Sequence, residues 1–169
     1  MMHDMHIFDL TVPQLNLALR NMDRWLGKAS EHANAGQLLT ARLAPDQFNF
    51  TKQVQTATDN AKLVPARLTG KTAPSHPDTE TTYEQLRARI ASVVEYLDTF
   101  KREDFDRPVE KIVLPWMKAP QHLLAMDYVI QFALPNFYFH VTTAYSILRH
   151  QGVQLGKMDF IGPINMKMA

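Results

Sequence analysis

The chain has 169 residues and a formal net charge of +1, with 46% hydrophobic and 21% charged residues. This size and composition fit one globular domain spanning residues 1–169. Basic and acidic residues interleave without a long basic block, which excludes the usual signature of a nucleic-acid-binding protein. The sequence contains no cysteine, so disulfides and thiolate chemistry are excluded, and any metal site would need nitrogen and oxygen ligands.

The N-terminal residues show no basic region followed by an apolar run, so we expect no secretory signal. The longest apolar region, residues 123–135, is short and is interrupted by Asp127 and Gln131. A segment of this kind does not span a bilayer. We therefore expect a cytoplasmic protein with no membrane partner.

The first expected helix covers about residues 4–33, with Pro13 either opening its main part or kinking it. A second helix should begin after Pro45, with Asp46 as N-cap, and should end near Pro65. Apolar residues in both helices recur at helical spacing, which predicts one buried face on each. These residues are Leu15, Leu19, Met22, Leu26, Ala29 and Ala33 in the first helix, and Phe50, Val54, Ala57, Ala61 and Val64 in the second.

The third helix should start at a capping box formed by Thr81 and Glu84, after a loop rich in glycine and proline. Its apolar stripe predicts a core face, and its charged face, which includes Arg87 and Arg89, is interpreted as solvated. The stripe consists of Leu86, Ile90, Val93, Leu97 and Phe100. The next connection, residues 101–119, is expected to be a loop with a small ribbon over one end of the molecule.

The last long helix should run from near Pro120 to about His150, followed by Gly152 as a natural helix stop. Pro135 cannot donate a backbone hydrogen bond, so we expect a kink immediately before Asn136. The remaining tail is expected to pack down as a C-terminal strap. Together these patterns predict an all-α, up-down four-helix bundle, and the long connections leave a crossover open.

The last helix carries a histidine on its apolar face. The stripe reads Met126, Ile130, Ala133, Phe137, His140, Ala144 and Ile147. Asn136 lies one turn before His140, and Gln53 borders the core stripe of the second helix beside small alanines. Buried polar side chains need partners, so the pattern predicts a polar site lined by Gln53, Asn136 and His140. The competing interpretation is a core histidine that is hydrogen-bonded to a backbone carbonyl or to a side chain.

Several segments resemble a known family. The segments LPNFYFH, LRHQGVQLGK and MDF near the C-terminus, and PDQFNFTKQVQTATDNAK upstream, are similar to a bacterial domain of unknown function. That family lies in the DinB-like (damage-inducible) superfamily of four-helix bundles. The resemblance covers most of the chain and implies a DinB-like bundle.

The resemblance also implies a site. Members of this superfamily typically bind a divalent metal through three histidines, one on the second helix and two one turn apart on the last. His140 matches the second member of the last pair, whereas the first falls on Asn136 and the second helix offers Gln53 or Gln55. The missing histidines disfavour the metal, since at most one of three imidazole ligands remains.

Three hypotheses about function follow. The first is a binding protein that holds a small polar ligand between helices, at Gln53, Asn136 and His140. The second is a divergent metal- or thiol-dependent transferase or isomerase, with His140 as the candidate catalytic residue. The third is a homodimeric interaction protein that uses an aromatic face of the last helix, namely Phe132, Phe137, Tyr138, Phe139 and Tyr145.

Overall fold

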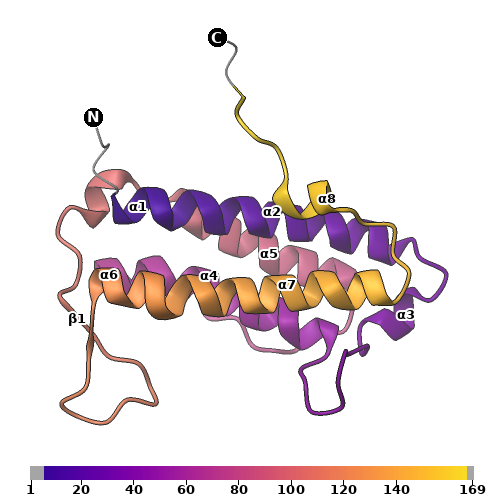
Figure 1. Ribbon diagram of the computed structural model, residues 1–169, viewed down its shortest axis with the longest axis horizontal. Coiled ribbons are helices and arrows are strands. Elements are labelled where there is room, and N and C mark those ends of the chain that lie inside the picture. Colours follow the sequence, from indigo (N-terminus) through magenta and orange to yellow (C-terminus); the bar gives the residue numbers. More distant parts are fainter. Residues whose placement is uncertain (1–5, 167–169) are drawn as a thin grey trace.

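Four long helices build the structure, a computed structural model that describes residues 6–166 (Figure 1). They are α2 (Val12–Ser30), α4 (Phe50–Thr69), α5 (Tyr83–Asp98) and α7 (Leu134–His150). The shorter helices are α1 (Ile7–Leu10), α3 (Ala35–Leu38), α6 (Ala125–Asp127) and α8 (Lys157–Ile161). A 3₁₀ turn η1 (Arg102–Phe105), a π-helical segment η2 (Tyr128–Ala133) and two short strands, β1 (Lys111–Ile112) and β2 (Leu123–Leu124), complete the chain.

The bundle contains a crossover. Helices α2 and α7 run in one direction along the bundle, and α4 and α5 run in the other (Figure 1). Helix α5 packs between α2 and α4, and α4 packs on α7. The parallel pair α4 and α5 is joined by residues 70–82, which return along the outside of the bundle. Within residues 6–166, every helix is too short or too polar to cross a lipid bilayer.

The helix boundaries correct two of the expectations at prolines. Helix α4 starts later than predicted, because the side chain of Asn49 accepts from the Lys52 amide at 3.0 Å, and Asp46 lies in the preceding turn. The helix then passes through Pro65 and ends at Gly70, which adopts φ 74°. Pro65, Ala66 and Leu68 are all buried, so tertiary packing of this turn favours continuing the helix past the proline, although the proline removes one backbone hydrogen bond.

The start of α5 is shifted by one residue. The capping box is formed by Thr82 and Gln85 and not by Thr81 and Glu84. The amide oxygen of Gln85 accepts from the backbone of both Thr81 and Thr82, at 2.7 and 3.2 Å. Glutamine completes a capping box as well as glutamate does, so the sequence offered two adjacent boxes.

The irregularity predicted at Pro135 takes the form of the π-helical segment η2. The Leu134 amide donates to the carbonyl of Val129, five residues back. A π turn holds one residue more than an α turn, so side chains before it are rotated relative to those after it. Met126 and Ile130 are therefore 37% and 52% exposed, although the helical spacing predicted them in the core.

The C-terminal tail packs down as predicted, but the last helix begins at Ala125 and not near Pro120, because residues 123–124 form a strand of the small ribbon. Strands β1 and β2 pair antiparallel, forming the small ribbon. The tail packs along α2, where the Trp25 indole donates to the carbonyl of Asp159 at 2.9 Å and Phe160 stacks on the same ring. Gly162, at φ 76°, allows this approach, because a Cβ there would lie 2.7 Å from the Asn21 amide.

Candidate functional site

Helices α4 and α7 bring two of the three predicted polar residues into contact. Gln53 lies in the first turns of α4 and is fully buried, and His140 lies on α7 and is 7% exposed. Because the two helices run antiparallel, these side chains meet across the interface although 87 positions separate them in the chain. The ring nitrogen Nδ1 of His140 lies 2.7 Å from Oε1 of Gln53.

The Gln53 amide determines which ring nitrogen of His140 carries the proton. Its Nε2 donates to the carbonyl of Phe48 at 3.2 Å, so its oxygen faces the imidazole. An amide oxygen can only accept, and Nδ1 must therefore donate. The other nitrogen, Nε2, then holds a lone pair and finds no hydrogen-bond partner among residues 6–166.

Two aromatic rings flank this imidazole. Phe48 lies nearly parallel to it at a centroid distance of 6.3 Å, and Phe139 meets it edge-on at 5.1 Å. Both rings are about half exposed, at 49% and 53%. Burial lowers the pKa of His140 below its usual 6.5, so the ring is neutral at pH 7.

The third predicted residue, Asn136, is not joined to this pair. It is half-buried one turn before His140, and its side chain makes no hydrogen bond within the described part of the chain. The alternative on the second helix, Gln55, points to the other side of α4, where its amide donates to Glu80 at 2.8 Å. The contact between Gln53 and His140 is thus the centre of the candidate site.

The residues at this site do not fit a metal held by three imidazoles. His140 is the one imidazole present, and its Nδ1 donates to an amide. The Gln53 amide makes a direct bond to His140 from the helix that would supply the third ligand. Across residues 6–166 no group of three or more histidine, aspartate or glutamate side chains is placed to hold a metal ion. The chain thereby departs from the metal site that the superfamily resemblance implied.

A second polar cluster lies between α4 and α5 and was not expected. The side chain of Arg89, interpreted from the sequence as solvated, is only 1% exposed. Its guanidinium lies 2.7 Å from Asp59 and 3.0 Å from each of Asp78 and Glu80, and it donates to Thr58 at 2.7 Å. The sequence contains one indication that Arg89 is buried. Residue 89 lies three positions after Leu86 and four before Val93, which places it on the core face of the helix.

The same cluster contains a buried lysine and a histidine. Lys62 pairs with Asp59 at 2.7 Å and donates to Nδ1 of His76 at 3.1 Å, so His76 donates through Nε2 to the Ser92 hydroxyl at 3.1 Å. Burial, followed by the positive charges of Lys62 and Arg89, lowers the pKa of His76. The carboxylates of Asp59, Asp78 and Glu80 form ion pairs with these positive charges. The cluster therefore has a structural role, tying residues 70–82 to the bundle.

A known protein with a similar sequence has the same fold as this chain. The chain is a DinB-like four-helix bundle, and a crystal structure of a DinB family member from Shewanella denitrificans superposes on it with a TM-score of 0.91. The two sequences are 45% identical, and the match covers 96% of each chain. Residues 7–161 match the family described as "Domain of unknown function (DUF1993)", and the chain belongs to that family. No curated protein matches the chain.

Proposed function

We propose that this protein binds a small polar ligand through His140, at the surface of the contact between α4 and α7. One observation carries the proposal. The bond from Nδ1 to Gln53 fixes the imidazole in the tautomer whose Nε2 lone pair has no partner among the described residues. Since a 7% exposed ring is held in one orientation, that lone pair is a positioned acceptor.

The neighbouring side chains define the chemistry of the ligand. A neutral imidazole nitrogen accepts a hydrogen bond from an N–H or O–H group. The half-exposed rings of Phe48 and Phe139 offer apolar contacts on either side. The Asn136 amide, one turn away on α7, offers both a donor and an acceptor. These groups favour a compound that combines a donor with a small apolar or planar part.

NMR of the full chain with histidine labelled at Cε1 with ¹³C tests this proposal. The probes are small alcohols, amides and amines. We expect saturable shifts of the His140 signal and weaker binding by Asn136→Leu and Gln53→Leu. The matched control is His150→Phe, which changes an exposed histidine at the end of the same helix. His140→Phe lacks this signal, so its binding is measured by calorimetry, and equal binding of the probes to this variant and to the wild type would contradict the proposal.

The same ring supports a second candidate function, a divergent thiol-dependent transferase. A neutral imidazole with a lowered pKa can take a proton from a bound thiol on Nε2, which makes the thiol a better nucleophile. The assay combines low-molecular-weight thiols with electrophilic acceptors and follows thiol consumption. Turnover that is no faster than that of His140→Ala would exclude this candidate.

A further inference from the structure

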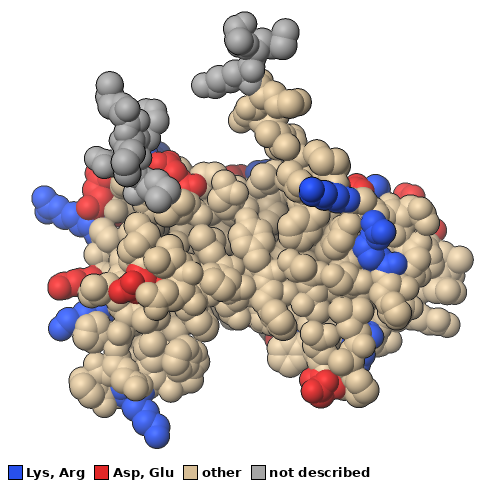
Figure 2. Space-filling view, in the orientation of Figure 1, with Lys and Arg blue, Asp and Glu red and all other residues tan. Residues whose placement is uncertain are grey.

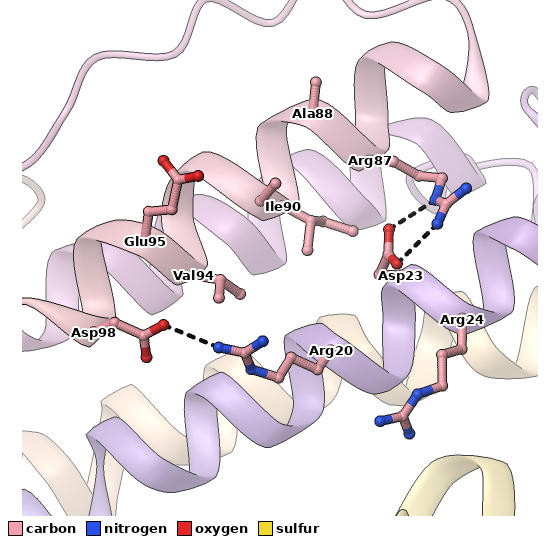
Figure 3. A pocket seen from close by; sticks show the side chains of 10 residues that line it. Arg20, Asp23, Arg24, Arg87, Ala88, Ile90, Val94, Glu95 and Asp98 are labelled. Atoms are coloured by element: carbon pink, nitrogen blue, oxygen red, sulfur yellow. Dashed lines mark hydrogen bonds and ion pairs between the residues drawn. The ribbon is translucent and has the colours of Figure 1, made fainter.

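A groove runs between α2 and α5, on a different part of the bundle from His140. It has a volume of about 680 Å³ and is lined by ten residues of these two helices (Figure 3). The buried side chains of Ile90 and Val94 form its apolar floor, at 2% and 7% exposure. Two small exposed residues of α5, Ala88 and Ala91, line it as well. Alanines at this spacing let another helix approach closely.

Two ion pairs bridge the groove. Arg20 of α2 pairs with Asp98 of α5 at 2.9 Å, and Arg87 of α5 makes two bonds to Asp23 of α2, at 2.8 and 3.0 Å (Figure 3). These four charges neutralise one another within the same chain. The groove is a preformed surface because α5 packs directly on α2, and the ion pairs, whose side chains are about one-third to one-half exposed, mainly neutralise its charges.

Two further charges of the groove have no oppositely charged partner among residues 6–166. Arg24 of α2 donates only to the side-chain oxygen of Asn21, at 2.9 Å, and Glu95 of α5 makes no ion pair. They lie on opposite walls and toward opposite ends of the groove (Figure 3). Counting all six charges, the α2 wall carries one net positive charge and the α5 wall one net negative charge, so the whole surface is neutral.

We propose that this groove is the interface with a second copy of the chain. In a two-fold symmetric dimer each surface meets itself, so it must be complementary to its own charges. Here α2 of one copy would lie along α5 of the other, and Arg24 would face Glu95 of the partner subunit, twice per dimer. An acidic or basic partner would instead select a surface with an excess of one sign, and this surface has none.

The proposed interface differs from the aromatic face of the last helix, on which the sequence-based dimer hypothesis was based. Of the five aromatic residues assigned there, only Phe139 is exposed, because Phe137 is in the core and the others are partly buried. The outer surface over α7 nevertheless carries few charges (Figure 2), and Phe139→Asp therefore serves to test that alternative face.

Sedimentation equilibrium of the full chain at micromolar concentrations measures the dimer. We expect Arg24→Glu and Glu95→Arg each to raise the dimer Kd about tenfold or more, because each places two like-charge contacts in the interface. An equimolar mixture of the two variants should dimerise again, as should the double variant. Only pairing between Arg24 and Glu95 across copies gives this rescue.

The control variant is Lys118→Glu, which reverses an exposed charge in the connection between β1 and β2. It should leave the Kd unchanged, and circular dichroism should show that every variant is folded. A wild-type chain that is monomeric at 100 µM would overturn the proposal. So would a dimer that dissociates on Phe139→Asp but is indifferent to both charge reversals.

Discussion

Replacing Arg89 by methionine tests how much the buried charge cluster contributes to the free energy of unfolding. Methionine keeps the length and the apolar stem of arginine but removes the guanidinium. Three carboxylates would then lose their central partner while they remain 11–34% exposed, with Glu80 the least exposed. Breaking a buried ion pair from one side costs about 3–5 kcal/mol. For a chain of this size that corresponds to a fall in Tm of about 6–20 °C.

Urea unfolding at pH 7, followed by circular dichroism, measures this loss. The matched control is Arg102→Met, because Arg102 pairs with Asp9 at 3.0 Å and both side chains are more than half exposed. An exposed pair contributes about 0–1 kcal/mol, so the control should unfold almost as the wild type does. If Arg89→Met lost no more free energy of unfolding than Arg102→Met, the cluster would contribute nothing and the reasoning would be wrong.

The loss should also depend on pH. Burial alone raises the pKa of Asp78 and Glu80, but hydrogen bonds and charges from Lys52, Arg89 and Gln55 outweigh it and leave both pKa values below normal. Carboxylates with depressed pKa values stabilise the fold above their ordinary values of 3.8 and 4.5, and that stabilisation is lost as the pH falls through the folded pKa values. The deficit of Arg89→Met should therefore shrink below about pH 4.

Two further predictions concern stability. The pKa of His76 is lowered from 6.5 in the folded chain, so the unfolded chain binds the proton more readily and stability should fall as the pH drops below 6.5. In thermal melts from pH 7.5 to 5, the Tm of His76→Gln should fall less than that of the wild type. An equal fall would contradict the assignment of this pH dependence to His76. Phe137→Ala should cost about 3–5 kcal/mol in urea unfolding because that ring is fully buried. Phe139→Ala, at a 53% exposed ring, should cost far less, and equal losses would mean that the face of α7 is misassigned.

The sequence predicted the bundle because each long helix carries its apolar residues on one face. It did not predict correctly which residues before Pro135 face the core and which face the solvent. The sequence shows that this proline lacks a backbone N–H, but it does not show that the helix responds by forming a π turn. Extending the 3.6-residue spacing backward through a π turn therefore placed Met126 and Ile130 in the core, where Ala133 and Phe137 correctly belong.

The contacts of the buried polar residues could not be predicted from the sequence either. Charged side chains usually lie in solvent, so the sequence predicts a solvated Arg89 despite its position on the core face. Its partners come from α4 and from residues 70–82, and only the parallel packing of α4 and α5 reveals them. Likewise, Gln53 and His140 could be named separately, but their contact depends on the antiparallel packing of α4 on α7.

The proposed binding site depends on the tautomer of His140, which ¹⁵N NMR of the imidazole nitrogens measures. At pH 7 we expect a neutral ring with the proton on Nδ1 and a lone pair on Nε2. Gln53→Leu should abolish this preference, because it removes the amide oxygen that accepts the proton. A proton on Nε2, or a charged ring at pH 7, would mean that His140 does not present the acceptor that ligand binding requires.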